Sequence, residues 1–184
     1  MAAALELFAE RGFRGTTVGD IEAAAGLTAR GGAMYKHFRS KEELLEAAVS
    51  HRIEEIQRMR EELLQLLPLD DLRSEAALLS RWVLAELQRE REINTILEKE
   101  GDLFPELRDR FYRELVEPGY RGVAELVANR FNPALGNDFD ADALAVLIGG
   151  ALVNYRRSEW TFGAVILDVD EERLLKAMLD ALLR

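Results

Sequence analysis

Apolar residues recur along this chain at spacings of three and four, which is the period of an amphipathic helix. In the N-terminal part the pattern predicts three short helices. The first ends at Gly12, the second begins at the Thr16-Thr17 pair and ends at Gly26, and the third runs from Thr28 to Tyr35. Threonine oxygens cap helix starts, and glycine takes the left-handed conformation that often follows a helix end.

Longer helices are predicted in the rest of the chain. A capping box at residues 40–43, with the Ser40 hydroxyl accepting a backbone N–H and Glu43 reaching back, opens a helix that continues to about Leu67. Further helices are predicted over 72–91, 93–100, 105–131 with a kink at Pro118, from Asp140 or Asp142 past Tyr155, and over 171–183. We therefore expect an all-α protein of about nine helices, with a three-helix domain in residues 1–50 and a larger helical domain in residues 51–184.

Charge is distributed unevenly between these two parts. The chain has 24 Lys and Arg against 34 Asp and Glu, a net charge of -10, which by itself argues against a nucleic-acid partner. Residues 1–52 carry seven basic and seven acidic residues, so the whole net charge comes from the remainder. The stretch 28–41 contains four basic residues and no carboxylate: Arg30, Lys36, Arg39 and Lys41. This local positive surface favours binding to phosphates.

Two short helices joined by a tight glycine-containing turn are typical of a helix-turn-helix, whose second helix lies in the DNA major groove. Possible phosphate donors surround that predicted second helix. Hydroxyl groups lie at the starts of helices, where free N–H groups attract phosphate, and further donors follow the helix. The candidate DNA contacts are Thr17, Thr28, Arg30, Tyr35, Lys36, His37 and Lys41.

Five stretches at these positions form a recognisable combination: residues 4–13, 16–18, 21–27, 35–38 and 40–45. Together they resemble the N-terminal signature of the TetR family of transcriptional regulators, over about residues 3–50. The resemblance implies that the third helix contacts bases through exposed residues of 28–34. It also implies phosphate contacts from Thr17, Tyr35, His37 and Lys41.

Two departures from the family pattern limit this transfer. Six residues separate Thr28 from Tyr35, where four are commoner in the family, so base contacts cannot be aligned one for one. Arg30 is the best base-reading candidate, with a phosphate contact as the alternative. Gly31 and Gly32 allow either a close approach of the backbone to DNA or simple loop flexibility. The family's usual basic arm before the first helix is also absent from this sequence.

The C-terminal part carries no motif, but large aromatic side chains fall on helices expected to surround one bundle interior. They are candidate effector contacts, with ordinary core packing as the alternative for each: Trp82, Phe104, Phe111, Tyr112, Tyr155 and Trp160. The small residues of 149–151 indicate close helix packing. The resemblance implies that the last two helices form the dimer interface, with Leu144, Leu147, Ala151, Met178 and Leu182 as contacts.

We therefore expect a homodimeric, DNA-binding regulator, a repressor that a small apolar or amphipathic effector releases from an inverted-repeat operator. We expect no cofactor and no metal site, because the chain has no Cys and only two His. An enzyme is not expected, because no phosphate loop or nucleophile motif is present. No apolar run is long enough to cross a membrane, so we expect a cytoplasmic protein. The alternative is a helical adaptor that has lost DNA binding.

Overall fold

A computed structural model of the chain describes residues 1–131 and 139–183. Every regular element in these residues is helical, which confirms the predicted all-α class. The chain divides into two compact units, Met1–Met59 with Glu90–Leu115 (unit 1), and Arg60–Arg89 with Val116–Arg184 (unit 2). The predicted domain boundary after residue 50 stays a prediction, and the unit that holds the N-terminal helices also takes in a segment from the middle of the chain.

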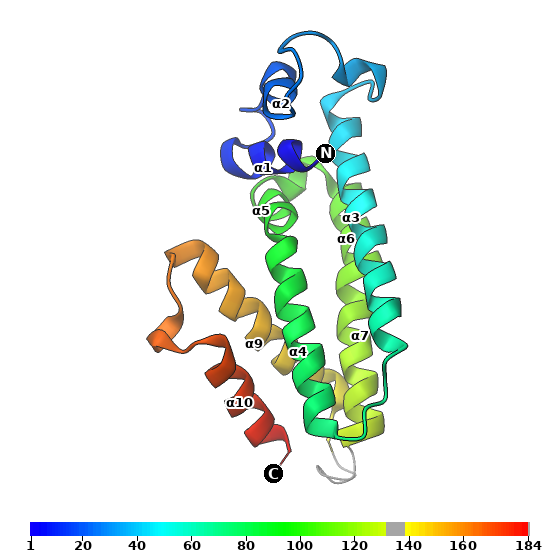
Figure 1. The fold of residues 1–184 in the computed structure, drawn as a ribbon, viewed down its shortest axis with the longest axis vertical. Helices are drawn as coiled ribbons and strands as arrows, with labels where there is room; N and C mark the ends of the chain where they lie inside the picture. The colour runs from blue at the N-terminus through cyan, green and yellow to red at the C-terminus, as the bar shows by residue number, and fades with distance from the viewer. Residues whose placement is uncertain (132–138, 184) are drawn as a thin grey trace. The chain divides into compact units, whose positions relative to one another are not determined.

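Unit 1 contains the N-terminal helices of Met1–Met59 and the later segment Glu90–Leu115 (Figure 1). Its elements are α1 (Ala2–Arg11), α2 (Val18–Ala24), the 3-10 turn η1 (Met34–Lys36), most of α3 (Lys41–Leu64), α5 (Arg91–Glu100), the 3-10 turn η2 (Gly101–Leu103), α6 (Pro105–Phe111) and most of the π turn η3 (Tyr112–Val116). Helix α1 packs against α5 and α2. Phe8, Ile21 and Leu44 are buried on the inward faces of their helices, whereas Phe38 is only partly buried.

Unit 2 is built from helices that enclose a leucine-rich core. Its elements are the end of α3, then α4 (Leu72–Arg89), α7 (Glu117–Leu126), the π turn η4 (Val127–Phe131), α9 (Ala141–Phe162), the 3-10 turn η5 (Ile166–Asp168) and α10 (Glu171–Leu182). Leu84 of α4 packs with Leu152 of α9 and Leu175 of α10. Asp140 is the N-cap of α9, since its Oδ1 accepts the Ala143 N–H at 2.9 Å.

The prediction of a third helix from Thr28 to Tyr35 is wrong. Between Thr28 and Ala33 the chain forms no helix, and only the single 3-10 turn η1 follows. One backbone hydrogen bond, from the Gly31 N–H to the Thr28 carbonyl at 2.9 Å, closes a turn here. Arg30 and Gly32 then adopt φ values of 60° and 69°. A right-handed helix cannot pass through left-handed residues, so the adjacent glycines and the conformation of Arg30 explain the failure.

Two other predicted helices differ in detail. Helix α3 ends at Leu64 rather than Leu67, because the N–H groups of Leu66 and Leu67 bond to carbonyls three residues back and tighten the last turn before Pro68. The irregularity predicted at Pro118 takes the form of the π turn η3, which directly precedes α7. Proline lacks the N–H that a continuous helix needs, and a π turn accommodates the interruption.

Close helix packing at residues 149–151 is confirmed and has a specific partner. Gly149 of α9 lies under the ring of Tyr120 from α7, so that a Cβ built on Gly149 would overlap Cε1 of the tyrosine. Burial raises the pKa of the Tyr120 hydroxyl above its ordinary value. Gly150, the next residue, has no atom within 4 Å of an added Cβ.

Replacing Gly149 by Ala should therefore destabilise the protein, although alanine is the better helix former. Overpacking costs about 1–3 kcal/mol, and the gain in helix propensity offsets about 1 kcal/mol of it. We expect thermal unfolding of Gly149→Ala at a lower temperature than the parent. Gly150→Ala is the matched control and should unfold no lower than the parent; equal behaviour of the two variants would contradict the Tyr120 contact.

Candidate nucleic-acid interface

The N-terminus of α2 is closed by a reciprocal pair of side chains. The Thr17 hydroxyl accepts the Asp20 N–H at 3.2 Å and donates to Asp20 Oδ2 at 2.6 Å, while Asp20 Oδ2 accepts the Thr17 N–H at 2.9 Å. These hydrogen bonds hold the pKa of the Asp20 carboxyl below its ordinary value. Thr17 is thus a helix cap, as predicted, and its proton is already donated to a carboxylate. Its role as a phosphate contact stays a prediction.

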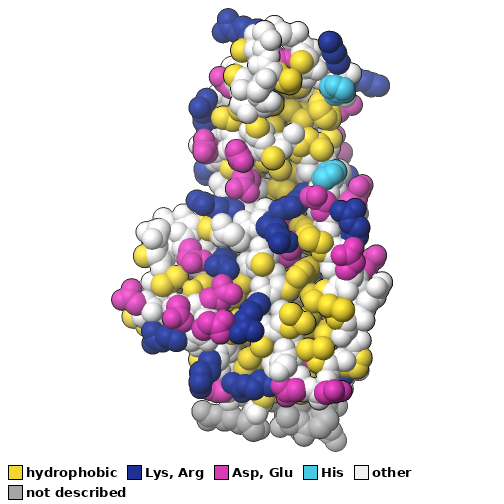
Figure 2. All heavy atoms as spheres, in the orientation of Figure 1, with side chains coloured by type: hydrophobic (Ala, Val, Ile, Leu, Met, Phe, Trp, Pro, Cys, Tyr) yellow, Lys and Arg dark blue, Asp and Glu magenta, His cyan; other side chains and the backbone are white. Residues whose placement is uncertain are grey.

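Exposed basic and polar side chains gather beyond α2. Arg30, Lys36, His37 and Arg39 are exposed, and Tyr35 has 59% of its surface accessible. Figure 2 shows Lys and Arg side chains, with a histidine, at the end of unit 1 formed by α2 and η1. Except for Lys41, the predicted DNA contacts in this stretch therefore present their side chains to solvent. The backbone that carries them is a loop and a 3-10 turn rather than the predicted helix.

A buried carboxylate that the sequence analysis did not single out holds this segment in place. Glu22 on α2 is 1% exposed, and its Oε1 accepts the Met34 N–H at 3.0 Å. Met34, at the start of η1, is itself buried. The contact ties the residues after the loop to α2 and so positions Tyr35 and Lys36 beside that helix.

Lys41 has a different environment from the one expected of a phosphate contact. Its Nζ donates to the Phe13 carbonyl at 2.5 Å and to the Thr16 carbonyl at 2.7 Å, and lies 4.2 Å from the centre of the Phe13 ring. An ammonium group has three N–H donors, so two of the three are used within the protein. Lys41 therefore bridges α3 to the turn between α1 and α2. A phosphate contact through the remaining donor stays a prediction.

The same turn is attached to the corner between α5 and α6. The Phe13 N–H donates to Glu100 Oε2 at 2.7 Å, and Lys99 Nζ donates to the Ala9 carbonyl at 3.0 Å. The ring of Phe104 meets that of Phe13 edge to face, with centroids 4.8 Å apart. Gly12, with a φ of 78°, lets the backbone pass close to Glu100, since an added Cβ would lie 2.9 Å from Oε1. The turn between α1 and α2 is thus anchored to the corner between α5 and α6.

The predicted effector contacts are divided between the two units. Phe104, Phe111 and Tyr112 belong to unit 1, where Phe104 packs on Phe13 and Phe111 is buried, whereas Trp82 and Tyr155 belong to unit 2. Trp160, also in unit 2, donates its indole N–H to Gln88 at 3.0 Å. Effector binding by any of these side chains stays a prediction.

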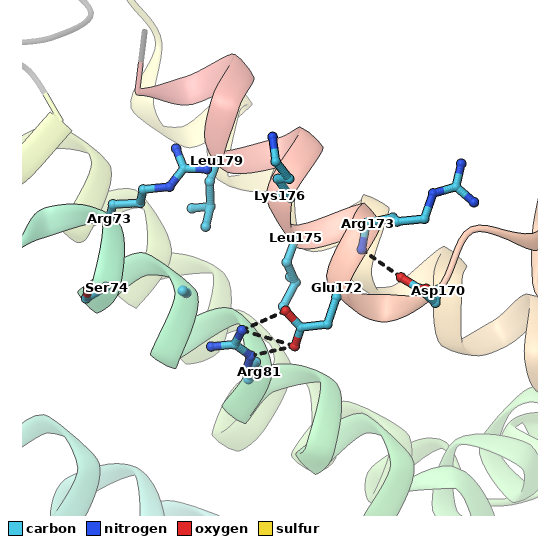
Figure 3. A pocket seen from close by; sticks show the side chains of 10 residues that line it. Arg73, Ser74, Arg81, Asp170, Glu172, Arg173, Leu175, Lys176 and Leu179 are labelled. Carbon is cyan, nitrogen blue, oxygen red and sulfur yellow. Dashed lines mark hydrogen bonds and ion pairs between the residues drawn. The ribbon is translucent and has the colours of Figure 1, made fainter.

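A hollow of about 550 Å³ lies between α4 and α10, away from the predicted residues (Figure 3). Its polar rim includes Arg81, paired with Glu172 at 2.9 Å, and Arg73, which pairs with Asp180 at 2.5 Å. Leu175 and Leu179 contribute apolar surface. Because these ion pairs are exposed, they contribute little to stability, and the hollow is a surface groove rather than an enclosed site.

The predicted dimer contacts are divided between the surface and the core. On α9, Leu147 is 69% exposed and Ala151 is also exposed, while Leu144 is partly buried. On α10, Met178 and Leu182 pack against buried leucines of their own chain. The exposed apolar residues of α9 also include Val146 and Val153.

In the described residues no group of His, Asp and Glu could hold a metal, and no helix could cross a membrane.

Comparison with known proteins supports the interpretation of the first helices. Residues 1–48 match the family model described as bacterial regulatory proteins of the tetR family. No curated protein matches the chain.

Three solved structures show the same fold as the whole chain. A protein from Mesorhizobium loti MAFF303099 described as a TetR-family transcriptional regulator is 23% identical, with a TM-score of 0.72, covering 99% of this chain and 92% of that one. FadR from Bacillus subtilis, in complex with stearoyl-CoA, is 20% identical, with a TM-score of 0.68, covering 99% and 95%. AibR in complex with isovaleryl coenzyme A and operator DNA is 21% identical, with a TM-score of 0.60, covering 98% and 94%.

Proposed function

We propose that this chain, a member of the TetR family of DNA-binding transcriptional regulators, is a homodimeric repressor that a small apolar or amphipathic effector releases from an inverted-repeat operator. The observation that carries the proposal is the match over residues 1–48 together with the exposed, acid-free basic segment at the end of α2. A DNA-binding role places the protein in the cytoplasm, where its operator would lie. The family is regulatory rather than enzymatic, and we propose no catalytic role.

In this proposal the loop and η1 face the DNA. Thr17, Thr28, Tyr35, Lys36 and His37 contact phosphates, and Arg30 reaches either a base or a phosphate from its left-handed backbone position. Lys41 contributes through the turn that it stabilises and through its one remaining donor. A loop stands where the first turns of a recognition helix would be. The residues that contact bases therefore do not follow the spacing of a regular helix.

Selection of bound duplexes from a random DNA pool tests this directly. The parent should enrich an inverted repeat, because a two-fold dimer presents two copies of the same surface. Tyr35→Ala should weaken binding to all sequences, as expected for a phosphate contact. If Arg30 contacts a base, Arg30→Ala should relax the sequence preference at one position of each half-site. If it contacts a phosphate, the variant should instead reduce the slope of log affinity against log salt concentration by about one. A folded dimer that enriches no sequence would contradict the proposal.

One structural observation favours a second candidate function. The absence of helix from Thr28 to Ala33 is what a helical adaptor that has lost DNA binding would show. The two functions differ in their salt dependence. A DNA complex must weaken steeply as salt rises, because phosphate contacts release counterions, whereas an apolar protein contact should change little.

Effector release requires a route between the bundle and the DNA-binding helices, and chain connectivity supplies one. Helix α4 ends at Arg89 and α5 begins at Arg91, with Glu90 between them. The other end of α5 carries Lys99, which donates to the Ala9 carbonyl of α1, and Glu100, which accepts the Phe13 N–H in the turn between α1 and α2. An effector shifts the equilibrium only by the difference in its affinity for the two states. We propose that it binds beside α4, near Trp82, and that α5 transmits the change.

Glu100→Ala should weaken this coupling more than it weakens DNA binding. The change removes the acceptor of the Phe13 N–H, so movement of α5 is passed less directly to the turn between α1 and α2. Coupling energies of this kind correspond to roughly 5–150-fold in affinity. We expect effector to lower operator affinity at least fivefold less in Glu100→Ala than in the parent, measured by fluorescence anisotropy of labelled operator. Glu106→Ala, an exposed change on α6, is the control, and an unaltered response in Glu100→Ala would contradict the route.

A further inference from the structure

Helix α4 carries two glutamates on a buried face. Glu75 and Glu86 are 2% and 3% exposed, and Leu79 and Trp82 lie between them. With 3.6 residues per turn, these four side chains fall within an arc of roughly 60°. Leu84, which joins the core with α9 and α10, lies roughly 160° around the helix from Glu86. The acidic face is therefore separate from the face of α4 that packs against α9 and α10.

The burial of Glu75 is explained by its partners. Its Oε2 accepts the Leu69 N–H at 2.8 Å and lies 3.2 Å from the guanidinium of Arg130. Buried charges persist where they are paired and hydrogen-bonded. Glu75 thus fastens the segment before α4 and the η4 turn to the start of the helix.

Glu86 has no comparable set of partners. Its Oε1 pairs with Arg89, whose side chain is half exposed, while its Oε2 is buried and has no hydrogen-bond partner. Among the described residues only Glu22 Oε2 shares this state, and the other oxygen of Glu22 anchors Met34. A buried carboxylate oxygen without a donor is costly and calls for an explanation.

A ligand that brings its own donor explains the arrangement. Trp82 lies one turn before Glu86 on the same face, so its indole ring is placed to contact the same ligand. A protonated amine satisfies the carboxylate with a charge-assisted hydrogen bond and is attracted to an aromatic face, while an anionic head group is repelled. Leu79 adds apolar surface for the body of the molecule.

We infer that Glu86 binds the polar end of the effector, and that the effector is an amphipathic amine. The inference rests on the proposed function for the existence of an effector, and it names the chemistry that α4 recognises. Glu86 and Trp82 lie on α4, which Glu90 joins directly to α5, so binding at this face acts on the helix that carries Lys99 and Glu100.

Trp82 provides a local signal for the test. The chain has two tryptophans, so Trp160→Phe leaves Trp82 as the only one. This full-length protein is titrated with octylamine, octanol and octanoate, which share one chain length and differ in the charge of the head group. We expect the fluorescence of Trp82 to report binding of octylamine at least tenfold tighter than octanol, with octanoate weakest.

Two further variants assign the preference to Glu86. Glu86→Gln keeps the shape of the side chain and removes the charge, and should abolish the preference for amine over alcohol. Glu98→Gln makes the same change at an exposed glutamate on α5 and should keep the preference. Circular dichroism confirms that each variant is folded. Equal affinity for octylamine and octanol in the parent, or a preference that survives in Glu86→Gln, would overturn the inference.

The fluorescence titration needs no DNA, so its result is independent of the proposed function. Tight, Glu86-dependent amine binding by a protein that selects no operator would support the inference and contradict the repressor. Operator binding without a preference for the amine would support the repressor and overturn the inference.

Discussion

Replacing Lys41 by Met is expected to lower the free energy of unfolding by about 3.5 kcal/mol or more. The change removes two charge-assisted hydrogen bonds, to the carbonyls of Phe13 and Thr16, and the contact with the Phe13 ring. Hydrogen bonds to charged groups contribute about 1.5–3 kcal/mol, and an exposed cation–π contact about 0.5–1 kcal/mol. Denaturant unfolding followed by circular dichroism measures the loss.

Lys36→Met is the matched control, because Lys36 lies in the same basic segment and is exposed. It should leave stability unchanged and reduce the slope of operator affinity against salt by about one, as the loss of one phosphate contact does. If Lys41→Met instead behaves like Lys36→Met, with unchanged stability and a reduced slope, then Lys41 is a phosphate contact and not the brace of the turn.

Leu147→Asp is expected to lower operator affinity about 100-fold or more by preventing dimerisation. Leu147, a predicted interface residue on α9, is 69% exposed, and a carboxylate there cannot be buried against a second copy without a partner. A dimer binds both half-sites together, which raises affinity by about 10²–10⁴ over one half-site. Sedimentation should show a monomer, and anisotropy with the selected operator should show the loss.

Leu66→Asp introduces the same charge at a leucine of similar exposure that lies outside α9. It should leave both the dimer and operator affinity unchanged. A dimer that persists in Leu147→Asp would contradict the proposed interface, whatever its affinity for DNA.

The failed third helix shows where local patterns lose their meaning. Thr28 and the apolar spacing up to Tyr35 fit a capped helix, yet two adjacent glycines make the helical state weak, and Arg30 takes a left-handed conformation instead. The Met34 N–H then bonds to Glu22, twelve residues away, and not to a helix carbonyl. A sequence pattern describes the preference of a segment, and such a weak preference is decided by contacts from elsewhere.

The environments of Lys41 and of three glutamates could likewise not be predicted from the local sequence pattern. The basic stretch 28–41 correctly indicated an exposed positive surface, but it could not separate Lys41, which turns inward, from Lys36, which turns outward. Glu22, Glu86 and Glu100 gave only one signal in the sequence, an acid near the apolar positions of a helix. That signal is weak, because most glutamates on helices are solvated.

By itself, the sequence determined the helical class, the caps at Thr17, Ser40 and Asp140, and the resemblance carried by residues 3–50. These features depend on neighbours within one or two helical turns, so they can be read along the chain. Only the tertiary structure decided the conformation of the loop after α2, the partners of Lys41 and Glu100, and the lack of a partner for Glu86 Oε2. Each of these depends on groups that folding brings together from distant positions, as with Phe13 and Glu100, 87 residues apart.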